Sequence, residues 1–152
     1  MTWDVHRSLD DTDAFIDLVI AAPEDQYDWA VREKDDPRVL GGLQFSLRSE
    51  QEGQLDYTLA EDVWGQGFAT EAARAVINWA METFPTLERI VAGIVVGNRG
   101  SERVLAKCGM IEACRYEERW AKYDRVMKLA TYVLHRHTWE QLPWRPTGTD
   151  AA

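Results

Sequence analysis

The segment over residues 55–74, LDYTLAEDVWGQGFATEAAR, has the residue types and spacing that most clearly suggest chemistry. Apolar and polar residues alternate up to Leu59, which predicts a strand, and residues 64–69 (WGQGFA) form a glycine turn. Thr70 can cap a following helix, with Glu71 in its first turn. The glycines let backbone N–H groups point toward one place, where a helix N-terminus adds about half a positive charge. The segment therefore suits an anionic diphosphate.

A plain strand-to-helix turn explains the same glycines equally well. The chain lacks the Gly-x-x-x-x-Gly-Lys-Ser/Thr phosphate loop, and residues 65–67 lack the third glycine of the dinucleotide fingerprint. The turn alone leaves both interpretations open, so the choice depends on a second motif.

That second motif lies over residues 98–110, NRGSERVLAKCGM. Together with the glycine turn it resembles the GCN5-related N-acetyltransferase (GNAT) superfamily, in its ribosomal-protein-alanine N-acetyltransferase-like (RimJ/RimL-type) branch. The first motif there is usually Gln/Arg-x-x-Gly-x-Gly/Ala, and the second is Asn-x-x-Ser-x-x-Val-Leu-x-Lys-x-Gly-Phe. Trp64 replaces the Gln/Arg and Met110 replaces the Phe, whereas Gly67 and Ala69 fill the small positions.

The resemblance implies acetyl-CoA (coenzyme A) as cofactor, with its pyrophosphate on the glycine turn. Asn98 would contact the pantetheine arm, and Arg103 and Lys107, four residues apart on one helix face, could meet the 3′-phosphate. A strand-end turn residue and a solvated basic helix face are the alternatives. The expected cofactor-binding residues are Leu59, Trp64, Gly65, Gln66, Gly67, Phe68, Ala69, Thr70, Asn98, Ser101, Arg103 and Lys107.

Asp56 is the first candidate for a base or an amine-steering group, because it is an acid inside a strand whose neighbours are mostly apolar. A solvated acid on an open sheet face is the alternative. By resemblance, Gln54 stands where the branch often has Glu, and certain aminoglycoside acetyltransferases have an Asp where Asp56 stands.

Three further catalytic candidates come from the resemblance. Ser101 would donate a proton to the leaving sulfur, unless it only caps its helix. Glu118 corresponds to an acid proposed as base in ribosomal-protein acetyltransferases, with Glu117 as the alternative. Tyr123 lies where other members of the superfamily keep a tyrosine acid, although tyrosine is also a good packing residue.

The expected acceptor is a primary amine, either a protein N-terminus or a small amine such as an aminoglycoside or a polyamine. At pH 7 a lysine-type amine is neutral only to on the order of one part in 2,500, whereas an α-amine is neutral to about a tenth, so an α-amine demands less of a base. Neither cysteine lies where a covalent acyl intermediate is suggested, so we expect direct transfer in a ternary complex. A non-catalytic acyl-CoA-binding or sensing module is the alternative.

Composition limits the remaining classes. With 152 residues and 45% hydrophobic content, the chain is expected to form one domain over residues 1–141 and an extended or mobile tail over 142–152. No membrane span or secretory leader is indicated, so the cytoplasm is the expected location. The net charge of −9 argues against nucleic acid, and the two cysteines and three histidines lack metal-site spacing.

The expected fold class is α/β, a mixed, mostly antiparallel sheet flanked by helices in the order α-β-β-β-α-β-α-β-β. The expected elements are a helix at 9–20 capped by Ser8, a hairpin at 26–47, a strand at 55–59, a helix at 71–84, a strand at 90–96, a short helix capped by Ser101 and ended by Gly109, and strands at 111–116 and 126–134.

GNAT proteins usually begin with a strand and a helix that precede the segment resembled by residues 3–16. By ordinary element sizes, about 25 residues are absent, and the neighbouring edge strand would then be unpaired. We therefore expect that a homodimer partner or the tail containing Trp144 covers this edge.

Overall fold

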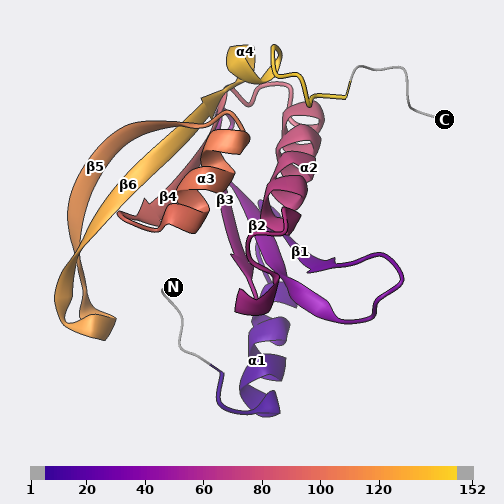
Figure 1. Ribbon diagram of the computed structural model, residues 1–152, viewed down its shortest axis with the longest axis vertical. Helices are drawn as coiled ribbons and strands as arrows, with labels where there is room; N and C mark the ends of the chain where they lie inside the picture. The colour runs from indigo at the N-terminus through magenta and orange to yellow at the C-terminus, as the bar shows by residue number, and fades with distance from the viewer. Residues whose placement is uncertain (1–5, 147–152) are drawn as a thin grey trace.

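The computed structural model describes residues 6–146 of the chain. One six-stranded sheet, in the order β1-β2-β3-β4-β6-β5, carries the helices α2 and α3 (Figure 1). The elements are α1 Leu9–Ile20, β1 Gln26–Arg32, β2 Val39–Ser49, β3 Glu52–Leu59, the 3₁₀ helix η1 Glu61–Val63, α2 Phe68–Thr83, β4 Arg89–Val95, α3 Arg99–Lys107, β5 Ile111–Trp120, the 3₁₀ helix η2 Ala121–Tyr123, β6 Arg125–His135 and α4 Arg136–Trp139. The predicted fold class is confirmed.

The core lies between the sheet and two helices. The buried face of α2 consists of Ala73, Val76, Ile77, Ala80 and Met81. It packs against strand residues such as Phe45, Leu55 and Ile90, each at most 1% exposed. α3 adds Leu105, and Cys108 directly after it, to the same cluster. Both helices therefore cover one face of the sheet.

β3 and β4 form the parallel pair of the described sheet, and they pair only over Glu52–Gln54 with Arg89–Val91. β3 continues to Leu59 and β4 to Val95, so the strands separate toward these ends. β4 stays paired with β6 up to its end at Val95. On the β4 side of β3, the backbone N–H and C=O groups beyond Gln54 therefore form no hydrogen bonds with another strand of the described sheet.

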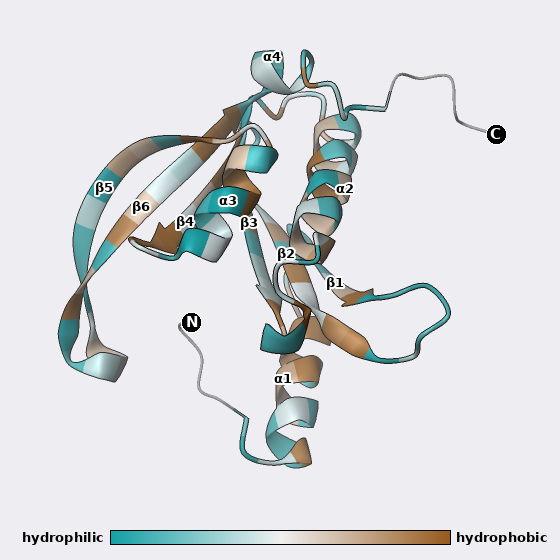
Figure 2. Ribbon diagram, viewed as in Figure 1, coloured by the Kyte–Doolittle hydropathy of each residue, from teal (hydrophilic) through white to brown (hydrophobic). Residues whose placement is uncertain are grey.

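α1 matches the predicted helix at both ends but is covered only in part by the rest of the described chain. The Ser8 hydroxyl accepts from the Asp11 N–H, and the Asp11 carboxylate accepts from the Ser8 N–H, both at 3.1 Å. None of its residues is buried, and Leu9, Leu18 and Ile20 are 81%, 73% and 77% exposed. Figure 2 shows the brown apolar positions of α1 standing clear of the sheet. The described residues therefore leave an apolar helix face uncovered.

α3 starts earlier than predicted. It begins at Arg99, and its N-cap is Asn98 rather than Ser101. The Asn98 side-chain oxygen accepts from the Ser101 N–H at 3.2 Å. Asparagine and serine are equally good N-caps, so residue type alone does not choose between them. The predicted stop at Gly109 is confirmed by its φ of +81°.

α4 was not predicted. Arg136 at its start donates to three carbonyls, those of Met81 (3.0 Å), Phe84 (2.8 Å) and Leu87 (2.6 Å). Trp139 at its end is 2% exposed. A cation placed at the last carbonyls of a helix is favourable, so Arg136 fastens the end of β6 to the end of α2.

The first residues of the expected tail pack on the core. A Cβ added to Gly109 would lie 2.9 Å from the Leu142 side chain, and the Arg74 guanidinium lies 5.1 Å from the centre of the Trp144 ring. Arg74 also donates to the Lys107 carbonyl at 2.7 Å, so Trp144 lies where α2 faces α3. The part of the expected tail that contains Trp144 therefore does not cover the β1 edge, and residues 147–152 lie outside the described part.

Within the described residues, β1 pairs with β2 on one side and with no strand on the other, so its outer edge is open. A groove of about 680 Å³ lies beside this edge, between β1 and α2. Trp29 and Val31 from β1 and Ala72, Ala75 and Trp79 from α2 line part of it. An apolar surface thus adjoins an unpaired strand edge.

Gly53→Ala tests how closely β3 packs on its neighbours. A Cβ at Gly53 would lie 2.3 and 2.4 Å from two ring atoms of Phe45, which is fully buried, so the ring or the strand must shift. We expect the free energy of unfolding, measured by urea denaturation, to fall by about 1–3 kcal/mol. Gly93→Ala is the control, because its Cβ meets no atom within 4 Å. Equal stability of the two variants would contradict the packing described.

Candidate active site

The predicted glycine turn follows β3 and the short helix η1, and it is open to solvent. Trp64 Nε1 donates to the Leu59 carbonyl at 2.9 Å, and Gln66 Nε2 donates to a carbonyl of η1 at 3.1 Å. Gly65 and Gly67 have φ angles of +78° and +99°, in the left-handed region that favours glycine. A Cβ at either position would meet no atom within 4 Å. The turn therefore needs its glycines for conformation and leaves space above its backbone.

The N-terminus of α2 faces this space. The helix begins at Phe68, earlier than predicted, and its N-cap is Gly67 instead of Thr70, because the left-handed glycine already turns the chain into the helix. The Gly67 carbonyl accepts from the N–H groups of Thr70 (2.9 Å) and Glu71 (3.0 Å). The N–H groups of Phe68 and Ala69 come before these and have no intrahelical acceptor. A diphosphate suits these donors and the positive end of the helix dipole.

Tyr57 links the two separated parts of the sheet. It lies on β3 beyond the paired residues, and its hydroxyl donates to the Ser101 carbonyl in the first turn of α3 at 3.4 Å. Burial raises the pKa of Tyr57 to about 12, so the hydroxyl stays protonated at neutral pH. Its regular alternation with Leu55 and Leu59 gave no sign of this contact in the sequence.

Asp56 projects from the opposite face of β3. Its Oδ2 accepts from Gln54 Nε2 at 2.6 Å. Gln44 lies across from it on β2, and Asp28 lies across from Gln44 on β1, so two carboxylates flank one amide. Burial raises the pKa of Asp56, although the Gln54 hydrogen bond and the Arg48 charge act against this. The carboxylate is half-buried rather than freely solvated.

α3 presents the other cofactor candidates of the second motif. Leu105 is fully buried, which leaves Arg103 and Lys107 exposed. Asn98 and Ser101 lie at the helix start, next to the separated strands. α3 also lies beside α2, so the candidates from both motifs gather on one face of the sheet.

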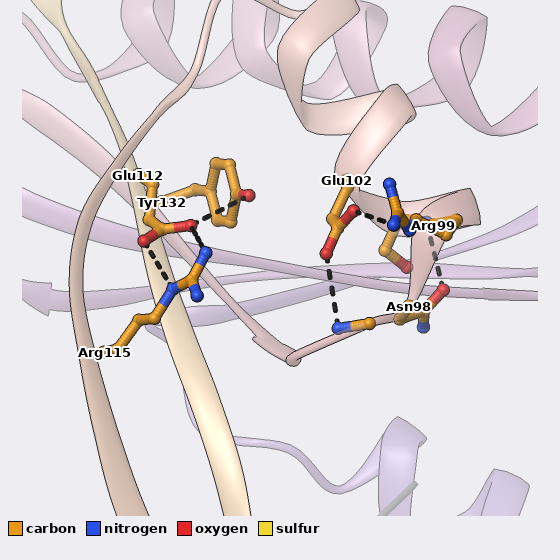
Figure 3. Close-up of polar contacts among 8 residues, drawn as sticks. Asn98, Arg99, Glu102, Glu112, Arg115 and Tyr132 are labelled. Carbon is orange, nitrogen blue, oxygen red and sulfur yellow. Dashed lines mark hydrogen bonds and ion pairs between the residues drawn. The ribbon is translucent and has the colours of Figure 1, made fainter.

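Sequence patterns gave no signal for a polar cluster beside α3, because its members come from three elements (Figure 3). Glu102 accepts from a backbone N–H of the loop before α3 at 3.3 Å and lies 3.9 Å from Arg99. Across from it, Glu112 on β5 accepts two hydrogen bonds from Arg115, at 2.7 and 2.9 Å, and one from the Tyr132 hydroxyl at 3.4 Å. The Arg115 hydrogen bonds hold the pKa of Glu112 below its usual value.

Glu118 and Tyr123 lie on the part of the β5–β6 hairpin that extends beyond β4. The pairing of β6 with β4 ends at Leu129, whereas Glu118 pairs with Met127, nearer the tip. Tyr123 is in η2, at the tip itself. Figure 1 shows this tip at the lower left, apart from β3. The structure does not bring these two candidates together with Asp56.

Within residues 6–146, no helix combines the length and apolarity needed to cross a membrane. No group of three His, Cys, Asp or Glu side chains in the same range is arranged to hold a metal ion.

Residues 1–111 match the family model of the acetyltransferase (GNAT) domain. This match covers well over half of the chain and includes the glycine turn and the second motif. The chain therefore belongs to the GNAT acetyltransferase family.

Curated relatives agree with this assignment. The uncharacterized N-acetyltransferase p20 of Bacillus licheniformis is 28% identical over 104 residues, which are 67% of this chain and 57% of that protein. The probable N-acetyltransferase YjcK of Bacillus subtilis (strain 168) is 33% identical over 89 residues, 57% of this chain and 49% of that protein. The chain thus spans about half the length of these relatives.

A solved structure similar to this chain is that of the microcin C7 self-immunity acetyltransferase MccE in complex with acetyl-CoA and AMP. It has a TM-score of 0.75 and 16% identity, over 85% of this chain and 72% of that chain. This likeness shows that the two proteins share the fold.

Proposed function

We propose that this protein is an acetyl-CoA-dependent N-acetyltransferase of the RimJ/RimL-type branch that acetylates a primary amine. The observation that carries the proposal is the position of the first N–H groups of α2, which have no intrahelical acceptor and follow, after η1 and the glycine turn, the strand that separates from β4. Anion-binding donors and unpaired strand backbone lie side by side, which is what a ligand with a diphosphate and a chain of amides requires.

The described residues fit acetyl-CoA, which supplies an acetyl group activated as a thioester. The backbone of the glycine turn and the N–H groups of Phe68 and Ala69 would bind the pyrophosphate. The β3 backbone beyond Gln54, which no strand of the described sheet pairs on the β4 side, would hydrogen-bond the pantetheine amides, as an added strand does, and Leu59 lies at the end of this stretch. Trp64, Gln66, Thr70, Asn98, Ser101, Arg103 and Lys107 are the side chains proposed to complete this binding surface.

Asp56 and Ser101 are the groups proposed to move protons. The Asp56 carboxylate takes a proton from the acceptor ammonium, and the neutral nitrogen then forms the C–N bond while the C–S bond breaks. The Ser101 hydroxyl donates a proton to the sulfur and regains one from the nitrogen. In total, an ammonium and a thioester become an amide, a free thiol and one proton. Tyr57 holds the turn that carries Ser101.

Transfer is proposed to be direct, without an acyl-enzyme. Cys108 is fully buried, and burial raises its pKa to about 11, so its thiol is not a nucleophile at neutral pH. Cys114 is exposed on β5, in the hairpin.

The acceptor amine is proposed to approach the sheet face that carries Asp56, opposite α2 and α3. Two carboxylates on this face, Asp28 and Asp56, and the net charge of −9 favour a cationic acceptor. Protein N-termini and small amines both meet this condition. A screen of N-terminal peptides, polyamines and aminoglycosides by thiol release from acetyl-CoA distinguishes them.

A non-catalytic acyl-CoA-binding module is the second candidate. It is favoured by Gln54, an amide where the branch often has an acid, and by the distance of the hairpin tip from β3.

A homodimer through β1 is proposed to cover the open edge. Antiparallel pairing of two β1 strands about Trp29 would place Tyr27 opposite Val31 on the apolar face. On the other face it would place Asp28 of one copy diagonally next to Arg32 of the second copy. The strand is therefore complementary to itself in both charge and apolarity.

Sedimentation velocity over a concentration series tests this dimer. We expect association of the wild-type chain and a shift toward monomer in Arg32→Asp, because the carboxylate introduced at position 32 would repel Asp28 of the other copy. Arg7→Asp makes the same charge change outside β1 and should associate like the wild type. A folded wild-type monomer at every concentration would exclude the dimer.

Gly65→Asp and Gly65→Asn test the diphosphate site by isothermal titration with acetyl-CoA. Both side chains tolerate the left-handed φ, and both extend into open space, so they differ only in charge. We expect at least about tenfold weaker binding for the Asp variant than for the Asn variant, with a smaller difference at high salt. Equal affinities would place the diphosphate elsewhere. Free CoA is the ligand control.

Asp56→Asn tests the base. We expect kcat to fall by about 10²–10⁴-fold while acetyl-CoA affinity stays unchanged. In the wild type, kcat/KM should fall as the pH drops through the raised pKa of Asp56, because the carboxylate is the active form. Asp25→Asn, in the loop before β1, is the control. Unchanged turnover in Asp56→Asn argues against the base role. A wild type that binds acetyl-CoA but releases no thiol with any amine supports the non-catalytic acyl-CoA-binding module.

A further inference from the structure

A row of side-chain hydrogen bonds leads from β2 to Asp56. Arg48, near the end of β2, donates through Nε to Gln54 Oε1 at 2.9 Å and through Nη2 to the same oxygen. Gln54 donates through Nε2 to Asp56 Oδ2 at 2.6 Å. The three side chains share the sheet face opposite α2 and α3, because the buried residues alternate with them along β2 and β3.

The guanidinium decides which way the amide of Gln54 points. A glutamine amide has one acceptor oxygen and one donor nitrogen, whereas a guanidinium has donors only. Arg48 can therefore bond only the oxygen, and this turns the nitrogen of Gln54 toward the carboxylate of Asp56. With the amide reversed, its oxygen would face the carboxylate without a proton between them. Arg48 thus acts on Asp56 through Gln54.

We propose that Gln54 and Arg48 are positioning residues for acetyl transfer, which hold one oxygen of Asp56 so that the other is presented to the acceptor amine. The inference rests on the proposed function, in which Asp56 takes a proton from that amine. Oδ2 of Asp56 accepts from Gln54 at 2.6 Å, so Oδ1 is the oxygen that we assign to the acceptor amine. The proton passes from the ammonium nitrogen to Oδ1 of Asp56. Arg48 and Gln54 exchange no proton in this step. A carboxylate oriented beforehand loses less freedom when the acceptor binds.

The groups that face Asp56 come from three strands. Gln54 lies on its own strand, Gln44 and Arg48 lie on β2, and Asp28 lies beyond them on β1. Burial raises the pKa of Asp56, whereas the Gln54 hydrogen bond and the Arg48 charge lower it. Removal of either partner should therefore raise this pKa further. As the pH is lowered, Asp56 of these variants should therefore become protonated at a higher pH than Asp56 of the wild type.

The first test is an NMR titration of the Asp56 carboxyl carbon in the full chain, which needs no acceptor. We expect higher midpoints in Arg48→Met and in Gln54→Leu than in the wild type. The double variant should shift by less than the sum of the two single shifts, because the part of the Arg48 effect that passes through Gln54 is already lost in Gln54→Leu, whereas the direct effect of the Arg48 charge remains. Arg89→Met is the control. It removes a cation from the neighbouring strand β4, but this cation forms an ion pair with Glu52 at 2.6 Å instead of a hydrogen bond with Gln54.

Unchanged midpoints in Arg48→Met and Gln54→Leu, or an equal shift in Arg89→Met, would overturn the positioning role of Arg48 and Gln54. Circular dichroism of each variant separates a shifted midpoint from unfolding.

The second test is the pH profile of kcat/KM with the best amine from the acceptor screen. Gln54→Leu should lose about tenfold or more, with its acid limb at higher pH, and Arg48→Lys should recover part of the Arg48→Met loss. The two proposals fail separately. A fully active Asp56→Asn removes the base, and with it the positioning role, whatever the midpoints show. An inactive Asp56→Asn with unchanged midpoints removes the positioning role alone.

Discussion

The short parallel pairing of β3 with β4 is the constraint on which the rest of the structure depends. Each strand has a full-length antiparallel partner on its other side, β2 for β3 and β6 for β4. The two antiparallel halves of the sheet are therefore complete in themselves and meet only at Glu52–Gln54 and Arg89–Val91. Beyond this contact each half follows its own twist. The exposed backbone of β3 is thus a consequence of sheet topology and does not require a special sequence.

Two interactions hold the separated halves at a fixed spacing. α2 connects β3 to β4 and buries its apolar face in one cluster with Phe45 of β2 and Ile90 of β4. On the far side, the hydroxyl of Tyr57 reaches the first turn of α3, which follows β4. One link is apolar and broad, and the other is a single hydrogen bond. The second is much the weaker, since one neutral hydrogen bond contributes about 0.5–1.5 kcal/mol.

The sequence predicts the parts of the site that are local. The Ser8 capping box, the two glycines of the turn and the stop at Gly109 each depend on residues within one turn of one another, and all three are confirmed. Local choices between equivalent residues are less secure, as the N-caps of α2 and α3 show. A glycine in the left-handed region and an asparagine one turn earlier replaced the expected Thr70 and Ser101.

Contacts between distant segments are beyond a local pattern. Tyr57 has the periodicity of a core residue, and only the position of α3 reveals its polar contact. Glu118 and Tyr123 were chosen by resemblance, but their distance from β3 depends on how far the β5–β6 hairpin extends past β4. The hydrogen bonds of Gln54 and Arg48 likewise depend on the register of β2 with β3, in which Ser46 faces Gln54. Register is a property of the folded sheet.

The uncovered face of α1 has a consequence for its order in solution. Isolated helices shorter than about 12–15 residues are marginal in water, and a single capping box adds only about 1 kcal/mol. α1 has 12 residues, and none of them is fully buried within residues 6–146, so burial stabilises this helix little. Its backbone amides should therefore exchange with deuterium far faster than those of α2, unless another surface covers it. The deuterium exchange rate of α1 therefore reports whether another surface covers its apolar face.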